Sequence, residues 1–194
     1  MYIKLRGYYS NFRKMILSKL YSIFIFFLVM PDLRRLRKDM AELEDIPNTK
    51  LEYIDEDDLT KFYIYVKVND GLYRNHYYKF FVRIVDDWPI SAPEFRIQEP
   101  IWHPNIEEYN PNIPDSGKIC VAPITFNYTG SILLSALVEA LKFLLHDCNF
   151  NPSNARNPVA ADELLKDENM FYAKARELVD KVKENDPSSD DDED

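Results

Sequence analysis

Two cysteines, Cys120 and Cys148, are the residues of this sequence that could act as strong nucleophiles. They lie far apart and form neither a CxxC pair nor a Cys/His cluster, so the sequence predicts no disulfide framework and no metal site. Cys120 follows Gly117 in a stretch without regular periodicity, and a cysteine in a partly exposed loop can exchange one thioester for another without a neighbouring base. A lone cysteine is more often a small buried hydrophobe, which is our interpretation of Cys148.

Transfer of an acyl group from a thioester to an amine develops negative charge on the carbonyl oxygen, and a side-chain amide can stabilise that charge by donating a hydrogen bond. Two asparagines precede Cys120 at candidate positions: Asn105 lies fifteen residues before it and Asn112 lies eight residues before it. The segments 103–109 and 110–116 begin with His-Pro-Asn-Ile and Asn-Pro-Asn-Ile, a pattern that indicates a seven-residue duplication.

The elements that must position these residues follow from the hydrophobic periodicity. Leucines and a methionine at helical spacing predict a helix over 32–44, with Asp32 as its N-cap. Four runs rich in aromatic and β-branched residues come next, and a turn at 69–71 between the second and the third predicts an antiparallel meander. The predicted strands cover residues 51–54, 61–68, 77–85 and 94–102.

A long loop over 105–130, rich in Pro, Asn and Gly, separates the predicted sheet from the later helices, and ordered loops of this length are usually functional. A broadly apolar segment predicts a buried central helix over 131–146, and residues 159–182 predict one or two more helices. This order indicates an α+β fold whose sheet packs one face on a helix. Because the chain has only four glycines and no Gly-rich phosphate loop, we do not expect nucleotide chemistry here.

Two segments at the ends of this loop resemble the signature of ubiquitin-conjugating enzymes. They are residues 102–106 (Trp-His-Pro-Asn-Ile) and 117–121 (Gly-Lys-Ile-Cys-Val). The turn at 70–73 and the proline-bearing loop at 88–93 also look like features of that family. The resemblance covers about residues 32–182, and it implies the ubiquitin-conjugating fold: an N-terminal helix, a four-stranded antiparallel meander, a long active-site loop, a central helix and C-terminal helices.

The same resemblance implies an active conjugating enzyme. A ubiquitin-like modifier would pass from an activating enzyme to Cys120 as a thioester, and a ligase, expected to be of the RING type, would direct its transfer to a lysine of a substrate protein. The activating enzyme uses the ATP, so this chain needs no cofactor of its own. In the family the histidine of the first motif fixes the loop through hydrogen bonds, and we expect that role for His103.

Positions that bind partners are implied as well. Arg34, Arg35 and Lys38 would form a basic face on the first helix that meets the activating enzyme and the ligases, with a merely solvated helix face as the alternative. Ile90 and Thr129 lie on the loops that the family offers to ligases.

The spacing of the duplicated segment departs from the family, in which the asparagine of the first motif stands eight residues before the cysteine. Asn112 keeps that spacing, whereas Asn105 keeps the register of His103 with the upstream strand. If Asn105 is the donor, the extra residues lengthen an exposed loop tip, which costs little free energy. If Asn112 is the donor, the end of the preceding strand must loop out of the sheet and His103 is lost from its place. We therefore favour Asn105 as the oxyanion donor, with Asn112 as its rival.

Three further departures bear on activity. Tyr128 and Gly130 replace a family Trp and Pro, and Asn157 stands before Pro158 where the family usually has an Asp that helps to deprotonate the incoming lysine. An amide can orient an amine but takes up no charge, so transfer to lysine should be slow. The second hypothesis is therefore a catalytically weak variant that acts as a binding module for the modifier or the ligase.

The spacing of the first half favours one modifier. Residues 46–58 and 68–73 are compact and lack the longer Trp-bearing turn of ubiquitin-type members. They resemble the branch that transfers the ubiquitin-like protein that activates cullins, and ubiquitin is the next choice. Residues 1–5 also look like that branch's N-terminal extension, which docks on its activating enzyme.

The expected division of the chain is an N-terminal extension (1–30), a catalytic core (31–184) and an acidic disordered tail (185–194). The extension has an apolar run, and a membrane anchor through 15–30 is the less favoured interpretation because the run falls short of the ~20 residues that span a bilayer. A docking segment and an alternative start are the others. The reduced thiols and the small basic face favour the cytoplasm, with the nucleus as a second compartment, and no nucleic-acid partner.

Overall fold

Helix α2 (Leu33–Glu44) opens the part of the chain that the computed structural model describes, residues 31–146, 148 and 155–184. Asp32 caps this helix, because its side chain accepts a hydrogen bond from the backbone N–H of Arg35 at 3.0 Å. Leu36, Met40 and Leu43 are buried at helical spacing. The predicted first helix is confirmed, whereas the expectations for residues 1–30 and 185–194 lie outside the described residues.

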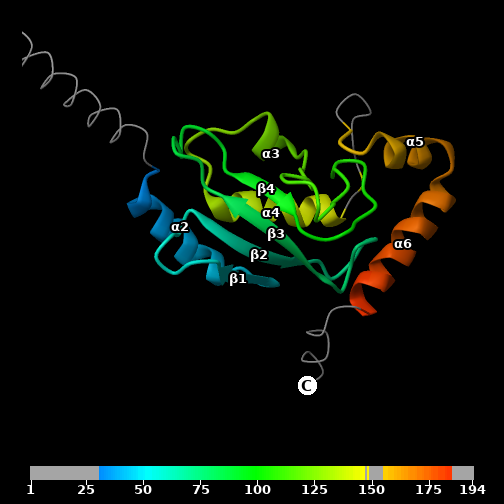
Figure 1. Ribbon diagram of the computed structural model, residues 1–194, viewed down its shortest axis with the longest axis horizontal. Coiled ribbons are helices and arrows are strands. Elements are labelled where there is room, and N and C mark those ends of the chain that lie inside the picture. Colours follow the sequence, from blue (N-terminus) through cyan, green and yellow to red (C-terminus); the bar gives the residue numbers. More distant parts are fainter. Residues whose placement is uncertain (1–30, 147, 149–154, 185–194) are drawn as a thin grey trace, which may run out of the picture.

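Four strands follow and pair in sequence order, each antiparallel to the next, so the predicted meander is confirmed (Figure 1). Alternation of buried and half-buried residues along the second and third strands gives the sheet one face toward the core and one outer face. The strands are β1 (Thr49–Tyr53), β2 (Lys61–Lys67), β3 (Tyr77–Arg83) and β4 (Glu94–Ile97).

Strand β4 ends at Ile97, five residues earlier than predicted. The backbone N–H of Lys79, across on β3, donates to the side chain of Glu99 at 2.6 Å instead of to a main-chain carbonyl. Pro100 then has no N–H to continue the ladder. The predicted strand was therefore too long, because the paired register between β3 and β4 ends at Ile97.

Helix α4 (Leu134–His146) packs across the inner face of the sheet, and Leu137, Leu141 and Leu145 on it are fully buried in the core. It begins three residues later than predicted, where the buried carboxylate of Asp39 on α2 accepts from the N–H of Leu134 at 3.3 Å. The prediction of a central buried helix is confirmed.

Three more helices complete the described part. The loop predicted to be irregular contains one short helix, α3 (Ala122–Thr125), whose first turn includes a proline, a residue that suits this position. The helical segment after residue 158 consists of two helices, α5 (Pro158–Lys166) and α6 (Glu168–Glu184), which lie at the end of the sheet away from α2 (Figure 1). No helix within the described ranges is long and apolar enough to cross a membrane.

Candidate active site

Cys120 lies on one arm of a narrow loop neck whose other arm carries Asn105. The N–H of Cys120 donates to the backbone carbonyl of Asn105 at 2.8 Å, and the side-chain nitrogen Nδ2 of Asn105 donates to the carbonyl of Cys120 at 3.1 Å. An amide nitrogen carries two hydrogens, so one N–H of Asn105 stays available for an acyl oxygen beside Cys120. Isoleucines 106 and 119 bridge the two arms and are buried.

The expectation of a partly exposed Cys120 is wrong, since only 4% of its surface is accessible. Its neighbours explain the burial. Ile119 is buried on the core side of the neck, and Val121 and Ile124 pack as partly buried residues against the core. Little of the Cys120 surface is therefore open to a reacting group.

His103 anchors the neck to the central helix. Its Nδ1 accepts from the N–H of Asn105 at 2.9 Å, which leaves Nε2 to donate to the carbonyl of Leu144 on α4 at 3.0 Å. Complete burial lowers the pKa of His103 from 6.5 to about 4, so the ring is neutral near pH 7. With both nitrogens occupied, His103 holds the backbone, and nothing in its surroundings assigns it a proton-transfer role.

Glycine is required at position 117, where the second arm leaves the sheet. Its φ is +77°, and a Cβ there would lie 2.3 Å from the carbonyl oxygen of Ile97. The carbonyl of Gly117 accepts from the N–H of Ile97 at 2.8 Å. The strand edge and the cysteine arm are thus joined backbone to backbone.

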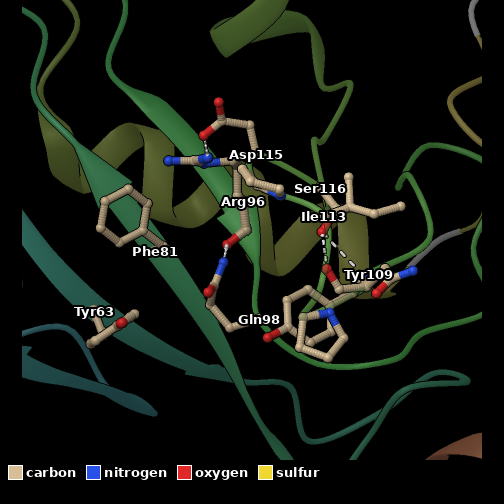
Figure 2. Close-up of a pocket in the computed structure, with 11 residues that line it drawn as sticks. Tyr63, Phe81, Arg96, Gln98, Tyr109, Ile113, Asp115 and Ser116 are labelled. Carbon is tan, nitrogen blue, oxygen red and sulfur yellow. Dashed lines mark hydrogen bonds and ion pairs between the residues drawn. The ribbon is translucent and has the colours of Figure 1, made fainter.

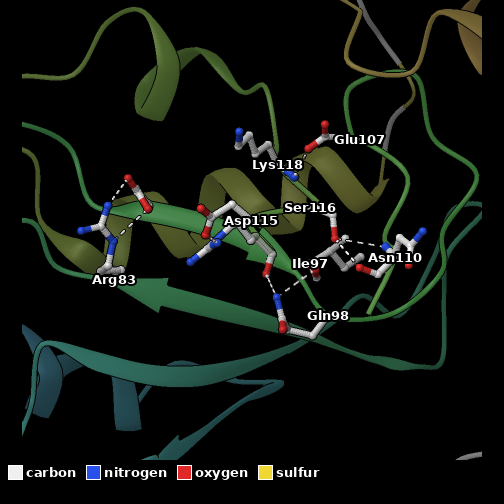
Figure 3. Close-up of polar contacts among 10 residues, drawn as sticks. Arg83, Ile97, Gln98, Glu107, Asn110, Asp115, Ser116 and Lys118 are labelled. Carbon is white, nitrogen blue, oxygen red and sulfur yellow. Dashed lines mark hydrogen bonds and ion pairs between the residues drawn. The ribbon is translucent and has the colours of Figure 1, made fainter. Parts of the chain in front are cut away.

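The additional residues of the duplication form a closed loop beyond the neck, over 108–116. Glu107 and Lys118 close its base: the N–H of Glu107 donates to the carbonyl of Lys118 at 2.8 Å, and the Glu107 carboxylate accepts from the N–H of Lys118 at 3.2 Å (Figure 3). Ser116 links the two sides of the tip through its contacts with the backbone of Asn110, at 3.1 and 2.8 Å.

This loop turns toward the outer face of the sheet. An ion pair between Asp115 and Arg96 fastens it to β4, and a pocket of about 260 Å³ lies between Tyr109 and Ile113 on the loop and Tyr63 and Phe81 on the strands (Figure 2). The loop tip is therefore attached to the sheet.

The two rival asparagines consequently differ in their surroundings. Asn105 contacts the backbone of Cys120 twice, whereas Asn112 is exposed on the loop tip, where its N–H donates to the side chain of Asn110 at 2.9 Å. The structure brings Asn105 and Cys120 together and leaves Asn112 beyond the neck.

Asn157 is the N-cap of α5 and lies against the first motif. Its side-chain oxygen accepts from the N–H of Ala160 and its backbone N–H donates to the carbonyl of Pro104, both at 3.0 Å. The residue is 6% exposed. Its contacts attach α5 to the first motif and leave it little surface for an incoming lysine.

Comparison with known proteins identifies this arrangement. The family model described as ubiquitin-conjugating enzyme matches residues 35–179. The chain belongs to the ubiquitin-conjugating enzyme family.

Two curated relatives of this family member are NEDD8-conjugating enzymes. The one from Drosophila melanogaster is 27% identical over 138 residues, 71% of each chain, and the one from Eremothecium gossypii is 30% identical over 137 residues, 71% of this chain and 70% of the relative. Among solved structures, a Toxoplasma gondii ubiquitin-conjugating enzyme E2 domain is similar with a TM-score of 0.66 and 16% identity, covering 77% of this chain and 97% of that chain. That structural likeness shows the fold, and the predicted fold class is confirmed.

The residues expected to bind the family's partners divide into two groups. Arg34, Lys38, Thr129 and Ile90 are exposed, and Ile90 has 77% of its surface accessible. The loops that carry Ile90 and Thr129 are neighbours, because a Cβ on Gly130 would come within 2.8 Å of the carbonyl oxygen of Pro89. These side chains are placed where partners can reach them.

Arg35 differs from its neighbours on α2 because its guanidinium points inward. It donates to the carbonyls of Gly130 and Ile132, the latter at 2.7 Å, and lies 5.1 Å from the ring centre of Trp88. Arg35 thus clamps α2 to the loop that carries Gly130 and to the loop that carries Trp88. The sequence carried no signal for this role, because helical periodicity does not tell a half-buried arginine from an exposed one.

Lys118 and Arg156 are two further residues that the sequence did not single out. Both are exposed and line a groove of about 380 Å³ beside the cysteine arm, together with Pro93, Ile119 and Ile124. The groove gives the approach to the neck a basic rim.

We expect the buried neutral His103 to make folding sensitive to acid. Its pKa is lower in the folded chain than in the unfolded one, so between pH 6.5 and about 4 the unfolded chain binds more protons and stability falls with pH. The loss should reach about 3 kcal/mol below that window. Urea unfolding across this range would measure it, and His103→Gln, which can imitate both hydrogen bonds, should reduce the slope. An equal slope in both proteins would contradict the assignment.

Replacing Arg35 should be costly because two backbone carbonyls and the Asp39 carboxylate, 3.6 Å from its Nε, would lose a donor. We expect Arg35→Ala to lower the free energy of unfolding by about 2–3 kcal/mol, with Arg35→Lys recovering only part, since one ammonium cannot span both carbonyls. The exposed neighbour Arg34 is the matched control, and Arg34→Ala should change stability by less than about 0.5 kcal/mol. Similar effects of both alanine substitutions in urea titrations would refute the clamp.

Proposed function

We propose that this conjugating enzyme carries a ubiquitin-like modifier of the NEDD8 type as a thioester on Cys120 and transfers it to a substrate lysine. The observation that carries the proposal is the neck itself, in which Asn105 binds the backbone of Cys120 through both its main chain and its side chain. The NEDD8-conjugating relatives and the compact first half of the chain support the choice of modifier over ubiquitin.

The first step is an exchange of thioesters. The Cys120 thiolate attacks the carbonyl carbon of the thioester that joins the modifier to its activating enzyme. A new carbon–sulfur bond forms, the old one breaks, and the activating enzyme's cysteine leaves as a thiolate. The activating enzyme has used its ATP earlier, so this chain contributes only its sulfur and the surface that docks the partner, for which we propose exposed Arg34 and Lys38.

The second step transfers the modifier to an amine. A neutral lysine attacks the thioester carbonyl, negative charge develops on the oxygen, and the available N–H of Asn105 donates to it. The intermediate collapses as its carbon–sulfur bond breaks, Cys120 leaves as a thiolate, and the attacking nitrogen loses its proton to solvent, which leaves an isopeptide bond. His103 keeps the Asn105 backbone in position throughout.

The incoming lysine must lose a proton, and no carboxylate stands at position 157 to accept it. Since Asn157 is buried and caps α5, we propose that it positions the loop and that aminolysis is slow in the absence of a ligase. Ile90 and Thr129 are the proposed ligase contacts, and a RING-type ligase would accelerate transfer by holding the thioester in a reactive geometry.

A second candidate function is a binding module with weak catalysis. The burial of Cys120 and the amide at position 157 favour it. An assay with ATP and purified activating enzymes distinguishes the two: a thioester forms only if the modifier reaches Cys120, and the activating enzyme that supports charging identifies the modifier.

We expect Cys120→Ala to abolish the modifier adduct and Cys120→Ser to replace it with an ester that withstands reductant. Gel shifts with and without reductant would measure both. Cys148→Ala is the control and should leave the adduct intact, because Cys148 Sγ lies 3.6 Å from the hydroxyl of Tyr73, beneath the backbone of the first motif. Charging that survives Cys120→Ala would mean that the nucleophile is elsewhere.

We expect Asn105→Ala to leave charging largely intact but to slow discharge onto free lysine by about a hundredfold or more, the usual effect of removing an oxyanion donor. Asn112→Ala is the matched control, since this residue lies on the exposed loop tip. Single-turnover discharge rates of the charged enzyme would compare them. A larger loss for Asn112→Ala would transfer the role to the second copy of the motif.

A further inference from the structure

The groove beside the cysteine arm lies at the β4 edge of the sheet, and the transfer steps described above do not use it. Its apolar lining includes the buried side chains of Phe95 and Ile119, and the exposed cations Lys118 and Arg156 stand at its rim. Its volume of about 380 Å³ lies in the range of sites that hold a small ligand or a short piece of chain. We call this surface the rim groove.

The carboxylates that line the rim groove are already paired with arginines of the same groove. Within the described ranges, no carboxylate lies within 4 Å of the charged nitrogens of Lys118 or Arg156. The rim groove therefore has an excess of positive charge, carried by these two residues. The two internal pairs are Arg83 with Glu94 and Arg96 with Asp115.

The backbone holds both rim cations close to the neck. Lys118 lies two residues before Cys120 on an arm that bridges to β4, and in an extended chain such residues lie on the same side, about 6.6 Å apart. The N–H of Arg156 donates to the carbonyl of Pro104 at 2.9 Å, directly before the proposed oxyanion donor. A substrate segment that reaches the Cys120 thioester must therefore pass these two charges.

The rim charges act in opposite directions on two kinds of substrate group. They repel the ammonium of an approaching lysine, whereas they attract a carboxylate that stands beside it in the substrate. In an extended acceptor segment, an acid two residues from the lysine lies on the lysine's side of the chain and about 6.6 Å from it. This spacing equals the one between Lys118 and Cys120, so an acid at this position can meet Lys118 while the lysine meets the thioester.

We propose that the rim groove binds an aspartate or glutamate of the substrate, two residues from the acceptor lysine, through Lys118 and Arg156. The proposal rests on the proposed function, since it concerns the lysine that attacks the thioester on Cys120. The ion pairs bring the amine to the thioester and disfavour acceptor segments with basic neighbours. Because both cations are exposed, the preference is modest and sensitive to salt.

Binding can be tested on the uncharged full-length protein, so that the result does not depend on a thioester. Two short peptides with one lysine are compared: one has Glu two residues from the lysine on either side, and the other has Gln there. In NMR titrations we expect the Glu peptide to shift the amide signals of Lys118, Ile119 and Arg156 more than the Gln peptide does. Salt at about 1 M, where the screening length is near 3 Å, should remove the difference.

Two results of the titration would overturn the proposal. One is equal shifts, or none, with the two peptides. The other is a response to the Glu peptide that is confined to signals outside the rim groove.

Discharge of the charged enzyme onto the same peptides connects binding with transfer. We expect the Glu peptide to react about three- to tenfold faster than the Gln peptide below saturation, the effect of one or two exposed ion pairs. Lys118→Gln with Arg156→Gln should make the two rates equal, and Lys118→Glu with Arg156→Glu should reverse the preference. Lys50→Glu is the matched control, because it is an exposed change on β1 at the opposite edge of the sheet, and it should keep the preference.

The readout is the ratio of the two rates within one variant, which cancels any general loss of activity. A ratio that is unchanged by reversal of both rim charges would overturn the proposal. Slower charging with an unchanged ratio would also overturn it, because the groove would then hold a segment of the modifier. If no thioester forms on Cys120 at all, the proposed function fails, and the titration still decides whether the rim groove binds the acid.

Discussion

A neutral imidazole inside the protein holds the loop of the candidate active site in place. His103 accepts from the N–H of Asn105 and donates to the carbonyl of Leu144, so one side chain connects the cysteine neck to the central helix. Both contacts need the uncharged ring in one tautomer, and complete burial favours that form. This connection also fixes the positions of Asn105 and Cys120, because each donates a hydrogen bond to the other's backbone carbonyl. The anchor point is the carbonyl of Leu144 in the last turn of α4, where helix carbonyls have no partner within the helix.

The closed neck explains how the candidate active site tolerates an inserted segment. The hydrogen bonds between Glu107 and Lys118 separate the residues that contact Cys120 from those that form the tip. Extra chain beyond this point changes only the tip, which is attached to the sheet through Arg96 and Asp115. The cost of a longer loop is then mainly conformational entropy, which grows slowly with length.

The sequence was sufficient for features that depend on periodicity and less so for those that depend on packing. Leu36, Met40 and Leu43 show helical spacing that only one face of a helix can satisfy, and the alternation in β2 and β3 identifies the meander. The end of β4 at Ile97 depends on where a side chain of Glu99 binds, which no pattern records. The burial of Cys120 and the inward direction of Arg35 are equally consequences of long-range contacts. In the described part of the chain, the errors therefore lie where segments distant in sequence meet.

The contact between Gly117 and Ile97 has a consequence for solubility. Strand β4 is an edge of the sheet, and a bare edge offers its N–H and carbonyl groups to strands of other molecules. Here the cysteine arm occupies that edge: Gly117 accepts from Ile97, and Arg96 and Lys118 form a β-bridge. The segment that carries Cys120, the proposed nucleophile, also protects β4 from pairing with another chain, so a change that loosened this arm would favour aggregation as well as misplace the thiol.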